Sequence, residues 1–251
     1  MSNRSPGIFA TAAALLASSG TATASDWTAN VTAASNYIWR GLTQSENGAA
    51  VSGGIDFVAE NGFYVGTWAS NVSYVPADPF SFEHDIYAGF RGGETITWDV
   101  GFLYYNYDTG ANYDFSEAYV ALGFKGATLK YSTLVQSNRD EALDQGLPGL
   151  TNKLDYGFGQ ASYLALDYSY TLPKEVTLGF HVGTHEGDFA RSFNGFLQGS
   201  YIDYSVSLSK GGFKFMISDT DLGVADQPGF ILPNNNGEPK FTVSYSVAID
   251  L

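Results

Sequence analysis

The side chains best suited to catalysis or metal binding are three histidines, His84, His181 and His185. His181 and His185 lie four residues apart in a stretch that alternates apolar and polar residues, a pattern typical of a strand. At about 3.3 Å per strand residue their rings would be roughly 13 Å apart, too far to share one metal ion. We therefore predict no metal site and no cofactor.

Nucleophilic catalysis has little support in the sequence. The chain contains no cysteine, which excludes disulfides, thiolate metal sites and cysteine nucleophiles. Serine is abundant, but no G-x-S-x-G motif marks a nucleophile. We predict that the protein is not an enzyme, although a Ser–His–acid site in the wall of a sheet stays open as an alternative.

A larger set of charged side chains falls on the polar face of alternating segments. Acidic residues outnumber basic ones in this set, and rings of carboxylates in a pore favour cations. The alternative is that the charges pair with one another and only solvate the interior; Arg40, in particular, could narrow a pore mouth or bond a loop carboxylate. The predicted pore-lining residues are Arg40, Asp56, Glu83, Asp85, Asp99, Glu117, Lys130, Asp167, His181, Asp203 and Lys214.

The segments that must position these side chains are strands, because alternation of period two dominates after residue 25. Most are longer than the five to six residues of an average strand and match the roughly 9–11 residues that a tilted strand needs to cross a bilayer. The twelve predicted strands are 27–40, 50–60, 63–73, 83–91, 95–107, 115–124, 127–135, 161–170, 175–185, 200–209, 212–219 and 240–251.

Short and long connections alternate between these strands. Asn61-Gly62 is a two-residue hairpin signal, whereas the segment from Gln136 to Gln160 is long and could fold inward to narrow a lumen. Outer-membrane barrels sort their connections in this way, with short periplasmic turns, longer extracellular loops and an even number of strands. We predict an all-β, antiparallel up-and-down transmembrane barrel of about 12 strands.

The two faces of the strands agree with that fold. In the segment 200–209, Ile202, Tyr204 and Val206 oppose Asp203 and Ser205, so an apolar face would meet lipid and a polar face would line the lumen. The last strand keeps its alternation to the terminal leucine, as a strand that closes a barrel must. Aromatic girdles at the strand ends are predicted from Tyr37, Trp39, Tyr74, Tyr105, Tyr107 and Tyr170.

The first residues predict export. One arginine precedes the short apolar run GIFATAAALLA, and Ala22 and Ala24 are small residues at the positions that a signal peptidase reads. We predict a cleaved signal peptide over residues 1–24 and one barrel domain over 25–251. The formal charge of -14 argues against nucleic-acid binding, because the phosphate backbone would be repelled.

Several segments resemble the TorF-type porin family of Gram-negative bacteria. The matching stretches are SNYIWRGLTQS (35–45), GFYVGTWASNV (62–72) and FEHDIYAGF (82–90). The resemblance implies an outer-membrane barrel with an assigned pore function, and it names no substrate. The residues that carry it are Tyr37, Arg40, Gly41, Gln44, Gly66, Trp68, Ser70, Asn71, Glu83, Asp85 and Tyr87.

The function predicted from these features is passive diffusion of small polar solutes or ions across the outer membrane, with a mild preference for cations. The alternative is a closed barrel that acts through its extracellular loops as an adhesin, receptor or lipid-modifying enzyme. A soluble β-sandwich is a third possibility, against which the sorting of the connections argues. The expected partners are outer-membrane lipid, lipopolysaccharide and the barrel-assembly machinery, with the oligomeric state left open.

Overall fold

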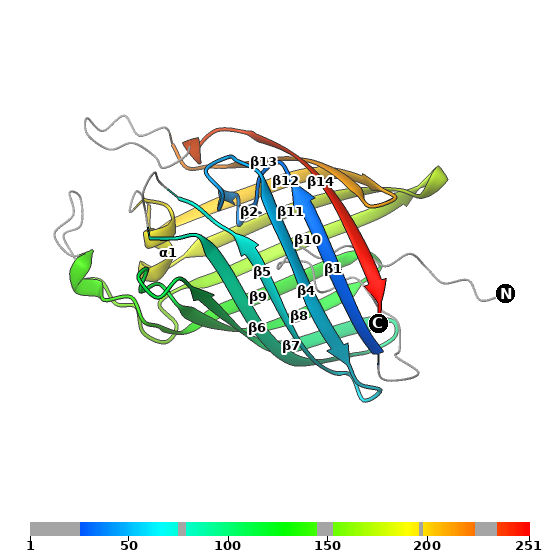
Figure 1. The fold of residues 1–251 in the computed structure, drawn as a ribbon, viewed down its shortest axis with the longest axis horizontal. Coiled ribbons are helices and arrows are strands. Elements are labelled where there is room, and N and C mark those ends of the chain that lie inside the picture. The colour runs from blue at the N-terminus through cyan, green and yellow to red at the C-terminus, as the bar shows by residue number, and fades with distance from the viewer. Residues whose placement is uncertain (1–25, 75–78, 145–152, 196–197, 224–234) are drawn as a thin grey trace.

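A computed structural model describes residues 26–74, 79–144, 153–195, 198–223 and 235–251. Twelve strands in these ranges close into one antiparallel barrel (Figure 1). They are β1 (Asp26–Ala34), β4 (Ala50–Val58), β5 (Phe63–Asn71), β6 (Phe82–Gly92), β7 (Ile96–Tyr107), β8 (Phe115–Phe124), β9 (Ala127–Ser137), β10 (Ser162–Leu172), β11 (Val176–Glu186), β12 (Ser200–Lys210), β13 (Phe213–Thr220) and β14 (Lys240–Asp250). The predicted fold class is confirmed.

Each strand of the barrel pairs with its neighbours in sequence, and the ring closes where β1 meets β14. The closing register runs from Thr28 opposite Asp250 to Ala34 opposite Ser244. The backbone of the last strand is therefore hydrogen-bonded to that of the first strand, so the last strand has no free edge that could fray. This closure explains why the alternation persists to the end of the sequence.

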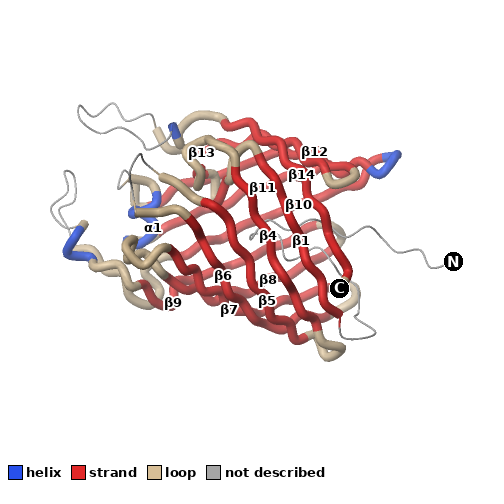
Figure 2. Tube along the Cα trace, viewed as in Figure 1, coloured by secondary structure: helices blue, strands red, loops and turns tan. Residues whose placement is uncertain are grey.

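The connections are sorted between the two ends of the barrel (Figures 1 and 2). At one end the turns are short; Lys125 and Gly126, for example, both have positive φ (48° and 83°), as a tight hairpin turn requires. The other end carries the long connections and the helix α1 (Asp188–Phe193). Short 3-10 segments follow β9 (η1, Glu141–Leu143) and β10 (η2, Pro173–Glu175).

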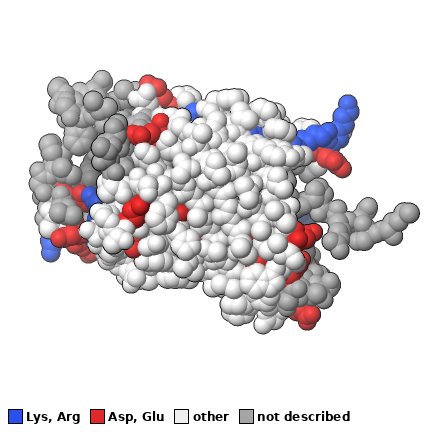
Figure 3. Space-filling model, in the orientation of Figure 1, with Lys and Arg blue, Asp and Glu red and all other residues white. Residues whose placement is uncertain are grey.

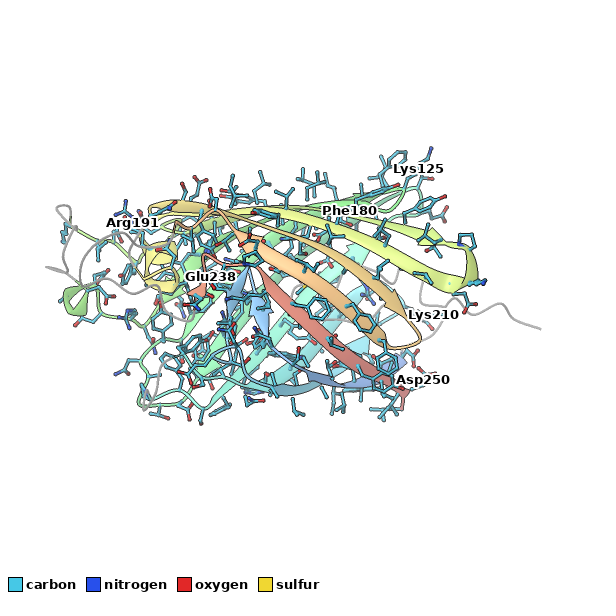
Figure 4. The ribbon with its side chains drawn as sticks, turned by 90° about the horizontal axis from the view of Figure 1, so that it is seen from above. Lys125, Phe180, Arg191, Lys210, Glu238 and Asp250 are labelled. Carbon is cyan, nitrogen blue, oxygen red and sulfur yellow. The ribbon has the colours of Figure 1, made fainter. Side chains whose placement is uncertain are left out.

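The outside of the wall is apolar between the two ends. Large apolar or aromatic side chains are exposed on every barrel strand except β5, and Phe180 is one of them, 44% exposed on the outer wall (Figure 4). Acidic and basic side chains gather at the two ends of the face in Figure 3, with few between them. An uncharged belt of this kind is what a lipid bilayer requires of a barrel.

Strand β5 is the one whose faces the sequence does not distinguish. Its inward residues Tyr64, Gly66, Trp68 and Ser70 are buried, and the alternate residues face outward. The alternation is therefore regular in space, although a glycine and a tryptophan share the inner face.

The predicted end of the first strand and most of the predicted girdle residues are wrong. The first strand ends at Ala34 and not at residue 40, because the chain leaves the wall there and turns into the lumen. Four of the six predicted girdle residues, Tyr37, Trp39, Tyr105 and Tyr107, are at most 7% exposed and lie inside the barrel. Tyr105 and Tyr107 are in phase with the inward Asp99 on β7, so a position near a strand end is not sufficient to assign a residue to a girdle.

Among the described residues, no helix is long and apolar enough to cross a membrane, a finding that concerns helices alone. The predicted signal peptide, residues 1–24, lies outside the described residues.

Candidate functional site in the barrel lumen

The connection between β1 and β4, residues 35–49, folds into the barrel and is called the inward loop here. Within it β2 (Ile38–Trp39) pairs with β3 (Leu42–Thr43). Arg40 and Gly41 form the turn with φ of 47° and 77°. A Cβ on Gly41 would lie 2.5 Å from Thr220 and 2.6 Å from Asp203, so the tip of the loop touches the opposite wall closely enough to require glycine.

Arg40 anchors the inward loop to two strands. Its Nη2 donates to both carboxylate oxygens of Glu117 at 2.8 and 2.6 Å, and its Nη1 donates to Nε2 of His185 at 2.9 Å. The guanidinium also lies between the rings of Trp39 and Tyr163, 4.2 and 4.3 Å from their centroids. A buried guanidinium held by a carboxylate and by two aromatic faces fixes the loop in one position.

Trp39 attaches the loop to an aromatic cluster at the mouth of the barrel. Its ring lies 6.3 Å from that of Phe115 and 5.0 Å from that of Phe193, which belongs to α1. Phe189, also on α1, is 1% exposed and packs against Phe115. The long connections therefore cover the inward loop on its outer side with packed aromatic rings.

The described residues of the segment from Gln136 to Gln160 take a small part in this closure. Leu154 and Tyr156 are buried in the same aromatic cluster, and Arg139 pairs with Asp144. Burial acts to lower the pKa of Arg139, but the hydrogen bonds to Asp144 raise it above its ordinary value. The loop that enters the lumen is thus the inward loop; residues 145–152 of the longer segment lie outside the described residues.

A carboxylate pair lies beneath the inward loop on β6. The hydroxyls of Tyr37 and Tyr107 donate to the two oxygens of Glu83 at 2.9 and 3.0 Å. Asp85, two residues further along the same strand, is 0% exposed, and neither of its oxygens has a hydrogen-bond partner among the described residues. An unpartnered buried carboxylate is costly, so Asp85 is an energetic weak point of the lumen.

A second layer of tyrosines and carboxylates lies nearer the short turns. Tyr64 donates to Asp99 at 2.6 Å and is hydrogen-bonded to Tyr119, and Tyr87 donates to Asp56 at 2.6 Å. A Cβ on Gly101 would lie within 2.8 Å of the hydroxyls of Tyr64 and Tyr119. The tyrosine rings therefore lie flat along the wall, over glycine, rather than across the lumen.

Two further groups complete the charged lining. His181 is bonded through Nδ1 to Asp167 at 2.7 Å and through Nε2 to Asp203 at 2.9 Å. Since carboxylates only accept, this arrangement suits an imidazolium that donates from both nitrogens. The Lys130 ammonium lies 4.1 Å from the ring centroid of Tyr119.

The side of the lumen opposite the carboxylates and tyrosines is lined mainly by small hydroxyl side chains. Small polar side chains of β1, β4, β5 and β14 form a hydroxyl wall, which consists of Thr32, Ser52, Ser70, Thr242 and Ser244. A cavity of about 50 Å³ separates this wall from Asn36, Tyr37 and Ile38 of the inward loop. Lys214 is the one charged residue in its lining.

The predicted lining residues are therefore all on the inner side, but they do not form one ring. All the predicted acidic residues except Asp85 are hydrogen-bonded to tyrosines, Arg40 or His181. Lys214 lies away from these groups, in the lining of the cavity. The family-motif residues cluster more tightly: Gln44 accepts from the hydroxyl of Tyr74 at 2.9 Å, Asn71 accepts from the N–H of Val51 at 2.8 Å, and Tyr37 packs on Trp68. These residues belong to the inward loop or to the wall strands that it contacts.

Sequence reasoning missed Tyr163, His185 and Tyr201 as partners of Arg40. Tyr201 donates to the Arg40 carbonyl at 2.9 Å. The usable signal was the dipeptide Arg40-Gly41, which predicts a turn where an uninterrupted strand was expected. Within the described residues, no group of His, Cys, Asp and Glu is arranged to hold a metal ion.

Comparison with solved structures finds the same fold in outer-membrane porins. The KdgM porin is 10% identical with a TM-score of 0.50, over 89% of this chain and 99% of that chain. The NanC porin is 12% identical with a TM-score of 0.51, over 89% and 98%. No curated protein matches. The model of one family, described as a bacterial protein of unknown function (Gcw_chp), matches residues 18–244, and the chain belongs to that family.

Proposed function

We propose that this protein is a bacterial outer-membrane channel for the passive diffusion of small polar solutes or ions. The observation that carries the proposal is a closed twelve-stranded barrel with an uncharged belt outside and a polar lumen inside. In this proposal the chain is exported by a signal peptide over residues 1–24, inserted by the barrel-assembly machinery and surrounded by outer-membrane lipid and lipopolysaccharide. The resemblance of residues 35–45 to TorF-type porins supports the same assignment.

Barrel width alone does not decide the question of conduction. Barrels of eight strands have filled interiors, whereas those of sixteen to eighteen enclose aqueous channels, and this barrel falls between them. The inward loop occupies much of the lumen on the side of β6 to β11. The hydroxyl wall and its cavity provide the polar path that the proposal needs.

The mild cation preference stays a prediction. The seven acidic residues of the predicted lining outnumber its four basic residues, Arg40, Lys130, His181 and Lys214, and this excess supports the preference. However, the hydrogen bonds to Glu83, Glu117, Asp99, Asp56 and Asp203 hold these carboxylates against the wall, which weakens their effect on a passing ion.

The test is single-channel recording of the refolded mature chain, residues 25–251, in a planar bilayer under a salt gradient. Stable conductance steps from protein that is heat-modifiable on gels would support the channel, and the sign of the reversal potential would decide the cation preference. Folded protein without steps would refute the channel.

A closed barrel that acts through its loops is the second candidate. It is favoured by the aromatic cluster of Trp39, Phe115, Phe189 and Phe193, which covers the inward loop at the mouth. A folded but non-conducting barrel would move attention to those loops, and binding to lipopolysaccharide-coated surfaces would be the next assay.

A further inference from the structure

The inward loop is bonded to the lumen wall at several points, but its residues Asn36, Tyr37 and Ile38 leave a gap on the side of the hydroxyl wall. Towards β6, β8 and β11 it is held by the buried contacts of Tyr37 and Arg40 with Glu83, Glu117 and His185. A solute could pass there only by breaking charged hydrogen bonds in a packed interior, each worth about twice a neutral one.

Towards the hydroxyl wall, the described residues of the loop make a different contact. No hydrogen bond joins Asn36, Tyr37 or Ile38 to Lys214 or to the hydroxyl wall, and the amide of Asn36 is instead bonded to Thr43, Ser45 and Asn47. The cavity of about 50 Å³ lies in this gap. That volume holds about three to five water molecules, each of which needs about 10–15 Å³ on the same measure.

The lining of the gap combines hydroxyls with apolar side chains, among them Trp68 and Met216. Its hydroxyls donate and accept equally well, as a partly dehydrated ion or a hydroxylated solute requires. Ala34 and Ala50 line the gap with short side chains.

Among the described residues that line the gap, Lys214 alone carries a formal charge. Among the described residues its ammonium has no carboxylate within ion-pair distance, and Asp167 acts on it only as an electrostatic neighbour. The other lumen cations differ: Arg40 is paired with Glu117, and Lys130 lies against the ring of Tyr119.

We propose that the permeation route runs through the gap between the inward loop and the hydroxyl wall, and that the charge of Lys214 attracts small anions there and offsets the cation preference of the wall carboxylates. This inference rests on the proposed channel function. Lys214 opposes the surplus of wall carboxylates, so the wild-type channel is only weakly selective and its balance depends on this one side chain.

The experiment compares reversal potentials of folded, heat-modifiable protein in a KCl gradient. Replacing Lys214→Gln should raise the ratio of potassium to chloride permeability by about sixteenfold. A unit charge about 5 Å away in water changes the local concentration of a monovalent ion by about fourfold, and its removal acts in opposite directions on potassium and chloride. Lys214→Glu should raise the ratio further, and Lys214→Arg should leave it near the wild-type value. Lys130→Gln is the matched control, because it removes the same charge from the other side of the lumen.

The experiment distinguishes failure of this inference from failure of the proposed channel function. A conducting Lys214→Gln channel with the wild-type ratio, or an equal shift in Lys130→Gln, would overturn the inference and leave the channel intact. Absence of conductance in the wild type would refute the channel itself, and the inference with it. If Lys214→Gln does not fold, the Lys214→Glu and Lys214→Arg pair gives the same comparison.

Discussion

Replacing Arg40 with methionine should release the inward loop from the wall. The change leaves the Glu117 carboxylate, 3% exposed, with only the hydroxyl of Tyr105 at 3.3 Å. Removing one partner of a buried ion pair costs about 3–5 kcal/mol, and the lost contacts with Trp39 and Tyr163 add about 0.5–2 kcal/mol each. Since methionine keeps part of the packing, we expect Arg40→Met to lower the free energy of unfolding by about 4 kcal/mol.

A double-mutant cycle separates the ion pair from simple loss of packing. Glu117→Gln removes the stranded charge, so the double variant Arg40→Met/Glu117→Gln should be more stable than the sum of the single effects predicts, by about 2 kcal/mol. Urea unfolding of protein refolded into lipid vesicles, followed by tryptophan fluorescence, measures each value. Lys210→Met is the control, because Lys210 is exposed at the short-turn end and should change stability by no more than about 0.5 kcal/mol.

The same variant has a functional consequence. An inward loop without its anchor should leave the lumen more often, so single-channel conductance should rise or become noisier in Arg40→Met. Additivity within about 0.5 kcal/mol, together with unchanged conductance, would refute the idea that Arg40 and Glu117 hold the loop in the lumen.

Three other predictions concern single positions. Gly41→Ala should destabilise the barrel by about 2 kcal/mol or more in the same urea assay. Gly159→Ala is the control and should destabilise it less, because Gly159 has a similar φ of 76° but no neighbour within 4 Å. Equal losses of stability would mean that the contact of Gly41 with the opposite wall is unimportant. Phe180→Arg places a charge on the lipid-facing belt and should cost about 2–4 kcal/mol if that position is near the bilayer midplane, and a cost below about 1 kcal/mol would contradict the membrane orientation. Asp85→Asn removes an unpartnered buried charge and should stabilise the protein by about 1–3 kcal/mol, whereas a loss of stability would show that Asp85 has a partner in the folded protein.

The barrel could be predicted from the sequence because its causes are local and repeated. Alternation fixes which face each residue takes, and the lengths of the connections fix which end they belong to. The segment 200–209 illustrates this: Ile202, Tyr204 and Val206 face outward and Asp203 is buried within, as alternation requires. Every one of the predicted strands is present in the structure, with boundaries that differ by a few residues except in the first.

The inside of the barrel was harder to predict, because its arrangement depends on contacts between distant strands. Alternation correctly places Glu117 and Asp203 in the lumen, but it does not indicate that Arg40 would meet one while Gly41 touches the other. Alternation does distinguish the aromatic residues near the strand ends, because Tyr105 is in phase with the inward Asp99 and Tyr170 with the outward Leu166. The girdle prediction included both because it used only their position near a strand end.

The placement of the inward loop follows from the size difference between the two sides of the lumen. On the side of β5 to β8, tyrosines lie over glycines along the wall and present their hydroxyls to carboxylates, which gives Tyr37 and Arg40 fixed partners. On the side of β13, β14, β1 and β4 the inward residues are mostly serine, threonine and alanine, and these short side chains leave a gap beside Asn36, Tyr37 and Ile38, although the loop tip at Gly41 touches Thr220. A loop that is bonded along one wall and touches the other only in places narrows a barrel without filling it, and so leaves selectivity to the few side chains that face the gap.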